Sequence, residues 1–169
     1  METLEKDLIL DKKQILQKIK RIAFEIFENN LNEKSLIIAG IDQGGYTLAR
    51  LLIKELKKIS PFEVILVKIK LDKEGPLQGD VQLDCDISKL KNMSIILVDD
   101  VLYTGKTFIQ SMKPFLEINV KQIQTVVLVN RNFTLFPIAA NYTGYELSTT
   151  LNDHIEVNLS LDGFGVYLY

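Results

Sequence analysis

The amino-acid sequence predicts an α/β protein whose central, mostly parallel sheet is flanked by helices. Apolar runs typical of strands buried on both faces recur along the chain, at residues 35–41, 94–101 and 125–129. Segments with the apolar spacing of amphipathic helices separate these runs. Because parallel strands need a crossover connection, usually a helix, this alternation indicates a parallel sheet.

The first half of the chain shows these elements in order. Apolar residues recur every 3 to 4 positions over residues 15–27, which predicts a helix with one buried face. A strand at 35–41, a helix over about 46–58 and a strand at 62–69 follow. Residues 70–79 contain two glycines and a proline, so we expect an exposed loop there.

The second half continues the pattern. Apolar and polar residues alternate over 81–87, which predicts a strand with one solvated face, as in a hairpin arm. The run at 94–101 is the clearest buried strand, and a helix follows it from the turn at Gly105 to about Leu116. Further strands are expected at 125–129 and in the tail, at 155–159 and 165–168.

The composition excludes several classes of protein. The chain has 169 residues, of which 47% are hydrophobic, which predicts one core and a single domain spanning 1–169. Its one cysteine, Cys85, permits no intrachain disulfide and no zinc site of four thiolates. The sequence shows neither a secretory signal nor the ~20 apolar residues that a membrane helix needs. We therefore expect a cytoplasmic protein that does not bind a membrane.

The formal net charge of −2 argues against a surface that attracts nucleic acid throughout, since lysine and arginine supply most of such affinity. A local basic cluster remains on the first predicted helix. It consists of Lys12, Lys13, Lys18, Lys20 and Arg21. This cluster is either a weak candidate for RNA binding or the solvated face of an amphipathic helix.

The strand at 95–98 ends in two adjacent carboxylates, Asp99 and Asp100, and the turn Tyr103-Thr104-Gly105 then opens a helix. Ligands of open α/β sheets bind at the carboxyl ends of strands, and a helix N-terminus attracts anions. The turn therefore predicts a phosphate site, and the carboxylates can accept hydrogen bonds from a sugar diol. Together these features predict a ribose 5-phosphate site at residues 98–107.

This segment has two other interpretations. Asp99 and Asp100 could merely end the strand while Thr104 caps the helix, but two adjacent acids after a long apolar strand are hard to explain in that way. The residues Gly105-Lys106-Thr107 could end a nucleotide-binding P-loop. The P-loop motif needs a glycine where this chain has Asp100, which excludes this interpretation.

The stretch VDDVLYTGKT resembles the phosphoribosyl-pyrophosphate signature of the type I phosphoribosyltransferases. It is most similar to the version in the family of bifunctional pyrimidine-operon regulators that are also uracil phosphoribosyltransferases. The resemblance extends through ILDKKQILQKIKRIAFEI, GIDQGGYTLARLL, VVLVNRNFTLFPIAANYTG and the Tyr-rich tail. It implies the type I phosphoribosyltransferase fold with a small hairpin arm or hood, and a homodimer.

On this chain the resemblance assigns Asp99 and Asp100 to the ribose hydroxyls, as the catalytic pair. It assigns the 5-phosphate to Thr104, Gly105, Lys106 and Thr107. Mg²⁺ is expected with the pyrophosphate. In the implied reaction a nucleobase nitrogen displaces pyrophosphate from the anomeric carbon through a cationic ribosyl centre, so the protein mostly positions groups and stabilises charge.

The loop that holds pyrophosphate in this family usually carries basic residues, whereas here it reads Asp42-Gln43-Gly44-Gly45. A carboxylate that faces pyrophosphate without a metal repels it, and a bound Mg²⁺ would turn Asp42 into a metal ligand. Gly44 and Gly45 either present N–H groups to the anion or only form a turn. The cations of the predicted arm are Lys68, Lys70 and Lys73.

Residues outside the signature carry weaker signals. By the resemblance, Arg131 lies where the family approaches the base, and an exposed arginine in a salt bridge is the other interpretation. His154, the only histidine, is expected on the surface, and Tyr103 is expected to pack against the turn or to form a lid over it. A sheet edge or a subunit contact is expected for Tyr142, Tyr145, Tyr167 and Tyr169.

Three functions of different classes remain open. The first is a phosphoribosyltransferase that joins a nucleobase, expected to be uracil, to the ribose 5-phosphate of phosphoribosyl pyrophosphate. The second is a regulator with weak or no turnover that senses a nucleotide in the same site and binds RNA through the lysine-rich first helix. The third is a structural or partner-binding relic of the fold. The acidic Asp42 weakens the first reading, and the negative net charge weakens the second.

Overall fold

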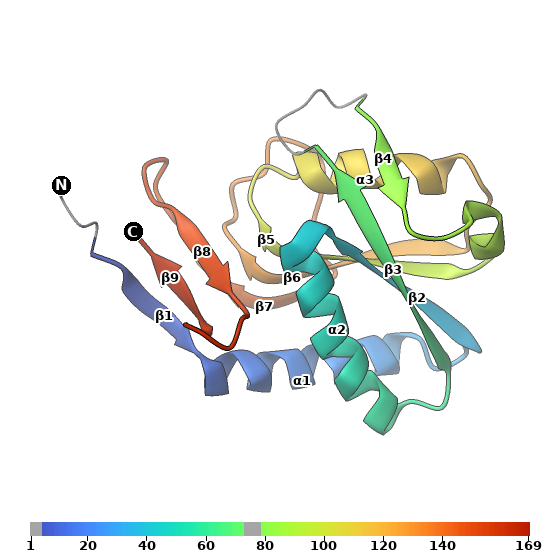
Figure 1. Cartoon of the computed structure of the whole chain (residues 1–169), viewed down its shortest axis with the longest axis horizontal. Helices are drawn as coiled ribbons and strands as arrows, with labels where there is room; N and C mark the ends of the chain where they lie inside the picture. The colour runs from blue at the N-terminus through green and yellow to red at the C-terminus, as the bar shows by residue number, and fades with distance from the viewer. Residues whose placement is uncertain (1–4, 73–78) are drawn as a thin grey trace.

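The computed structural model describes residues 5–72 and 79–169 and has two sheets (Figure 1). Its elements are, in chain order, β1 (Asp7–Asp11), α1 (Lys12–Asn29), β2 (Ser35–Ile41), α2 (Asp42–Ile59), β3 (Glu63–Leu71), β4 (Val81–Leu83), the 3₁₀ helix η1 (Ile87–Leu90), β5 (Ser94–Leu102), α3 (Lys106–Leu116), β6 (Gln122–Asn130), β7 (Tyr142–Glu146), β8 (Ile155–Asn158) and β9 (Gly165–Leu168). The larger sheet has six strands and the smaller has three.

The six-stranded sheet has the order β4-β3-β2-β5-β6-β7. All neighbours in it are parallel except β3 and β4, so the predicted mostly parallel α/β class is confirmed. β2 and β5 lie side by side with Gly40 opposite Val98, which brings the carboxyl ends of these two strands to the same edge of the sheet. The arm formed by β3 and β4 is the predicted hairpin.

The sheet separates two hydrophobic cores. Helices α1 and α2 bury their apolar stripes on one face, and α3 covers the other face with Phe108 and Phe115 (Figure 1). Burying each large aliphatic or aromatic side chain contributes roughly 1.5–3 kcal/mol, so both helix layers are held chiefly by these apolar contacts. A capping box between Asp11 and Gln14 fixes the start of α1.

The small sheet joins the two ends of the described chain. β1 pairs antiparallel with β9, from Asp7 opposite Leu168 to Asp11 opposite Gly165, and β8 pairs with the other side of β9. We call this three-stranded sheet of β1, β9 and β8 the hood. In Figure 1 it stands beside the edge of the main sheet at which the parallel strands end. The tail strands were predicted from the sequence, whereas β1 was not.

Two predicted boundaries are wrong. The strand expected over 81–87 ends at Leu83, because the carboxylate of Asp84 accepts the N–H of Lys68 at 2.8 Å and that of Asp86 accepts the N–H of Ser88 at 3.0 Å, which starts η1. The polar loop expected at 42–45 is instead the first turn of α2. Of the predicted loop 70–79, residues 73–78, including Lys73, lie outside the described residues.

Between residues 5–72 and 79–169, no helix combines the length and the apolar character needed to cross a bilayer.

Candidate functional site

The two carboxylates at the end of β5 begin on opposite faces of the sheet. Successive side chains of a strand point to opposite faces of the sheet. Leu97 packs in the core under α3, and Val98 packs in the core under α1 and α2. By this alternation Asp99 faces α3 and Asp100 faces α2. Each carboxylate accepts a hydrogen bond from the next backbone N–H, Asp99 from residue 100 at 3.0 Å and Asp100 from residue 101 at 2.9 Å. These bonds hold both side chains in place, and Asp99 is only 2% exposed.

The turn after β5 has the backbone that an anion site requires. Gly105 is left-handed, with φ 87°, and caps the start of α3, a conformation that favours glycine. The hydroxyl of Thr104 accepts the N–H of Lys106 at 3.2 Å, but the N-cap of α3 is Gly105 and no side chain caps this helix, so the alternative reading of Thr104 as the helix cap is wrong. The carbonyl of Thr104 accepts the N–H groups of Leu135 and Phe136, which ties the turn to the segment after β6.

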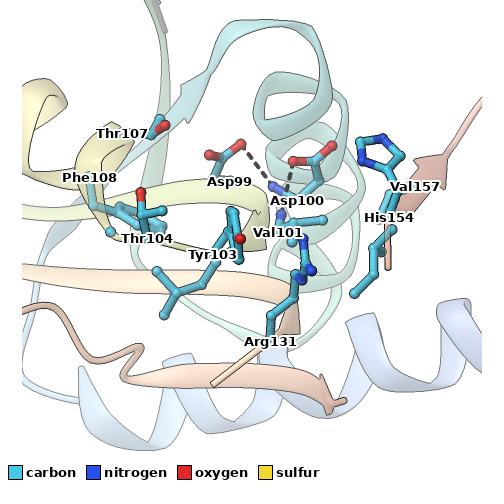
Figure 2. A pocket seen from close by; sticks show the side chains of 13 residues that line it. Asp99, Asp100, Val101, Tyr103, Thr104, Thr107, Phe108, Arg131, His154 and Val157 are labelled. Carbon is cyan, nitrogen blue, oxygen red and sulfur yellow. Dashed lines mark hydrogen bonds between the residues drawn. The ribbon is translucent and has the colours of Figure 1, made fainter. Parts of the chain in front are cut away.

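A cavity of about 430 Å³ lies over these groups (Figure 2). β5 and the turn contribute one wall, α3 contributes Thr107 and Phe108, and the hood contributes a second wall with β8 and the residue before it, His154. The lining residues are Asp99, Asp100, Val101, Leu102, Tyr103, Thr104, Gly105, Thr107, Phe108, Arg131, His154, Ile155 and Val157. In Figure 2 the carboxylate of Asp99 lies on the Thr107 side and that of Asp100 on the His154 side.

The structure thus brings most of the predicted site residues to one cavity. Asp99, Asp100, Thr104, Gly105, Thr107 and Arg131 line it. Lys106 follows Gly105 in the first turn of α3 without lining the cavity. Asp42, Gly44 and Gly45 lie in the first turn of α2 and do not line this cavity.

The glycines of that first turn allow α2 to start against β5. A Cβ atom on Gly45 would lie 2.3 Å from the carbonyl oxygen of Val98, and one on Gly44 would lie 2.4 Å from Oδ2 of Asp100. A residue with a side chain therefore fits at neither position unless the atoms of β5 or of Asp100 move. The two glycines therefore have a packing role in addition to any contact with an anion.

Asp42 does not line the main cavity. It has φ 49°, and its carboxylate accepts the N–H of Leu71 at 3.4 Å. Together with Lys70 and Asp72 it lines a separate hollow of about 330 Å³ at the base of the arm. Lys68, the neighbouring arm lysine, lies over the ring of Tyr46 at 5.1 Å.

Arg131 is buried, being 7% exposed. Its Nε donates to the Thr149 hydroxyl at 2.8 Å, and its Nη2 donates to the carbonyl oxygens of Asp153 at 2.8 Å and Thr150 at 3.3 Å. The guanidinium also lies 4.0 Å from the centroid of the Tyr103 ring. The interpretation of Arg131 as an exposed arginine in a salt bridge is therefore wrong.

Sequence reasoning missed two features of the cavity. Tyr103 stacks on Phe133, with ring centroids 5.4 Å apart and planes 22° apart, so the turn is walled by an aromatic pair. His154 is exposed, as expected, yet it lines the cavity, and its ring contacts that of Tyr169. Both features depend on contacts between segments distant in sequence, and no local pattern indicates them.

The donor set fits a Mg²⁺ ion that arrives with a phosphorylated substrate. Within the part of the chain that the structure describes, no group of three or more His, Cys, Asp or Glu side chains could hold a metal alone. Mg²⁺ is typically held by one or two carboxylates together with substrate phosphates. Asp99 and Asp100, adjacent at the cavity wall, supply such carboxylates.

The comparisons with known proteins agree with this geometry. The family model of the phosphoribosyl transferase domain matches residues 6–162. The bifunctional protein PyrR of Clostridioides difficile is 32% identical over 170 residues, covering 94% of this chain and 94% of that protein, and PyrR of Clostridium novyi is 33% identical, covering 92% and 91%.

Solved structures share the fold at lower sequence identity. The hypoxanthine phosphoribosyltransferase of Trypanosoma cruzi, in a ternary substrates complex, superimposes with a TM-score of 0.79 at 17% identity over 98% of this chain and 95% of that one. A hypoxanthine-guanine phosphoribosyltransferase of Bacillus anthracis gives 0.77 at 15% identity over 95% of each chain. The predicted fold is confirmed, and the chain belongs to the type I phosphoribosyltransferase family, in which proteins named PyrR are among its relatives.

Proposed function

We propose that this protein transfers the ribose 5-phosphate of phosphoribosyl pyrophosphate to a nucleobase. The observation that carries the proposal is the wall of the main cavity, where Asp99 and Asp100 stand beside the turn Thr104–Thr107 at the start of α3. A phosphate accepts hydrogen bonds from the N–H groups of such a turn, and a ribose diol donates to carboxylates. One cavity thus offers complementary groups to both ends of a ribose 5-phosphate.

The roles of the two acidic residues follow from the charge that develops during transfer. Breaking the bond between the anomeric carbon and pyrophosphate leaves positive charge on the ribosyl ring, and a nucleobase nitrogen then bonds to that carbon. Asp99 and Asp100 hold the ribose hydroxyls and stabilise the cationic ring electrostatically. Because each carboxylate is already held by a backbone N–H, little reorganisation accompanies the reaction.

Mg²⁺ bound with the substrate would neutralise part of the pyrophosphate charge and stabilise it as a leaving group. Asp99 and Asp100 are the residues whose position suits this ion, and Asp42 remains a predicted ligand on the pyrophosphate side. Thr104, Gly105, Lys106 and Thr107 bind the 5-phosphate. Gly44 and Gly45, in the first turn of α2, face pyrophosphate through their backbone.

The base is proposed to be uracil, as the sequence resemblance implies. The solved structures with this fold are named for hypoxanthine and guanine, so purines are the alternative substrates. A base entering the cavity would lie between the hood, at His154 to Val157, and the stacked pair of Tyr103 and Phe133. Arg131, placed near the base by the resemblance, borders the same region.

A second candidate is a nucleotide-sensing regulator with little or no turnover. Among the described residues that line the main cavity, Arg131 is the only lysine or arginine, and its Nε and Nη2 donate to protein oxygens. Little positive charge is therefore available for pyrophosphate. RNA binding would use the exposed Lys13 and Lys20 of α1, whereas Lys12 and Lys18 lie over the rings of Phe164 and Tyr145.

The test is formation of UMP from phosphoribosyl pyrophosphate and uracil with Mg²⁺, with hypoxanthine and guanine run in parallel. The double variant Asp99→Asn, Asp100→Asn should abolish turnover and weaken UMP binding far more than the binding of inorganic phosphate, because carboxylates bind the diol and repel anions. The matched control is Asp84→Asn, Asp86→Asn at the exposed start of η1. Equal losses for UMP and phosphate would contradict the assignment of the ribose to this pair, and UMP binding without turnover would favour the regulator.

A further inference from the structure

Arg131 connects the end of β5 and the turn that follows it with the segment 149–153. Its backbone N–H donates to the carbonyl of Leu102 at the end of β5, at 2.9 Å. Its guanidinium lies on the face of Tyr103 in the phosphate turn. The same guanidinium donates to Thr149 and to the carbonyl of Asp153, in the segment that leads into the hood.

That segment is itself a closed turn. The carboxylate of Asp153 accepts the N–H of Thr150 at 2.6 Å, and the N–H of Asp153 donates to the carbonyl of Thr150. The hydrogen bond from Thr150 and, more weakly, the charge of Arg131 lower the pKa of Asp153. The next residue, His154, lines the cavity, and β8 begins at Ile155. The position of this turn therefore sets the position of the hood wall.

We propose that Arg131 is a positioning residue that holds the turn 149–153, and with it the hood wall at His154, at the distance from β5 that the nucleobase requires. This inference rests on the proposed function, because the base is taken to bind between the hood and Tyr103. It differs from the role that the resemblance suggested, in which Arg131 itself meets the ligand.

The geometry opposes direct ligand binding through Nε and Nη2 of this side chain. To reach a ligand through Nε and Nη2, the guanidinium would have to leave three oxygen acceptors in a site where it is 7% exposed. Unmade hydrogen bonds of buried charged groups are costly. The planar guanidinium lies over the ring of Tyr103 while the N–H groups at its edge donate to several acceptors at once. The compact ammonium group of lysine cannot make both kinds of contact. Lysine is therefore expected to replace Arg131 poorly.

The experiment compares Arg131→Met, Arg131→Lys, Thr149→Val and the double variant Arg131→Met, Thr149→Val in the full chain. The control is Thr143→Val, the same change at a half-buried threonine of β7. Amide hydrogen exchange of residues 149–155 is measured without ligand, and the KM values for uracil and for phosphoribosyl pyrophosphate are measured separately. UMP affinity is measured by calorimetry.

Arg131→Met should speed exchange at 149–155 and raise the uracil KM, each on the order of tenfold, the effect of losing a hydrogen bond to a charged group. The KM for phosphoribosyl pyrophosphate should change much less. Thr149→Val should give a smaller change of the same kind, Arg131→Lys should not restore the wild-type values, and Thr143→Val should change neither. Because both residues act through one contact, the double variant should be little worse than Arg131→Met.

Two results would overturn the proposal. One is a Thr149→Val protein that behaves as wild type while Arg131→Met loses ligand affinity, since Arg131 would then touch the ligand itself. The other is unchanged exchange at 149–155 in Arg131→Met. If that variant fails to fold, Thr149→Val and its exchange rates decide alone.

The exchange measurement also separates this inference from the proposed function. A wild-type protein without turnover on uracil, hypoxanthine or guanine would contradict the transferase proposal. Faster exchange at 149–155 together with weaker UMP binding in the Arg131 variants would still support the positioning role in such a protein.

Discussion

Gly44 lies directly against the carboxylate of Asp100, at a distance that leaves no room for a side chain. A Cβ atom at residue 44 would meet Oδ2 of Asp100 at 2.4 Å and Cγ at 2.9 Å. The first turn of α2 and the carboxylate of Asp100, 56 residues apart in the sequence numbering, are thus in contact. A side chain at residue 44 would therefore displace the carboxylate of Asp100.

Replacing Gly44 with alanine should displace the Asp100 carboxylate without unfolding the chain, because the clash involves the end of a side chain that can rotate. We expect UMP affinity to fall roughly tenfold, equivalent to about 1.4 kcal/mol, with a small change in Tm. Calorimetric titration of UMP and thermal unfolding measure the two quantities. Unchanged UMP affinity would show that Asp100 does not depend on this contact.

The neighbouring change, Gly45→Ala, is the matched control. Its Cβ would meet the backbone carbonyl of Val98 at 2.3 Å, and backbone cannot rotate away. Overpacking of this kind costs about 1–3 kcal/mol, which corresponds to a fall in Tm of about 2–12 °C for a chain of this size. The two alanine variants should therefore differ in kind, one losing affinity and the other stability.

A second prediction concerns Glu33, which joins the loop before β2 to β5 and β6. Its carboxylate accepts from Nζ of Lys121 at 2.7 Å and from Oγ of Ser94 at 3.0 Å. The hydrogen bond from Lys121 is the largest effect and lowers the pKa of Glu33 below its usual 4.5; burial opposes it, and the weaker hydrogen bond from Ser94 lowers the pKa further. A carboxyl group whose pKa is lowered by folding stabilises the fold while it is ionised.

Glu33→Gln should lower Tm at pH 7, by about 1–3 °C for an ion pair whose lysine is half exposed. The difference from wild type should persist above pH 4.5 and disappear as the pH falls through the lowered pKa, since the wild-type carboxyl then becomes neutral too. Glu117→Gln, at the exposed end of α3, is the control. A Tm difference that stays constant down to the acid limit would exclude the ionic explanation.

Local patterns were enough to predict the centre of the site. The apolar run of β5, its two acids and the turn at Gly105 are adjacent in sequence, so the strand, the helix α3 and the cavity-lining residues Asp99, Asp100, Thr104, Gly105 and Thr107 could be inferred together. The same holds for β2, whose residues after Ser35 are all buried and which shows the continuous apolar pattern of a central strand.

The hood and the surroundings of Arg131 could not be predicted in the same way. β1 forms only by pairing with β9, which joins Asp7 to Leu168 across almost the whole chain, and its sequence has no clear alternation. Likewise, the acceptors of Arg131 lie 18 to 22 residues downstream, in a segment without a recognisable motif. Such contacts depend on tertiary structure, which intrinsic strand propensity indicates only weakly.

Asp42 decides between the transferase and the regulator, because it is the acid in the segment proposed to face pyrophosphate. Losing one well-placed charge stabiliser typically costs on the order of 10²–10³ in rate, so wild-type turnover should be slow. Asp42→Lys should tighten pyrophosphate binding and raise turnover, while Asp42→Asn should do less.

The backbone conformation of residue 42 makes a stability control necessary in this experiment. Its φ of 49° suits asparagine better than lysine, for which the left-handed conformation costs about 1–2 kcal/mol, so Tm must be measured for both variants. The assay is pyrophosphate release with uracil at saturating Mg²⁺. A gain in Asp42→Lys despite a lower Tm would identify electrostatic repulsion as the cause of slow turnover. Brisk wild-type turnover that falls in Asp42→Lys would instead mean that Asp42 acts through the metal, and the regulator without turnover would be excluded.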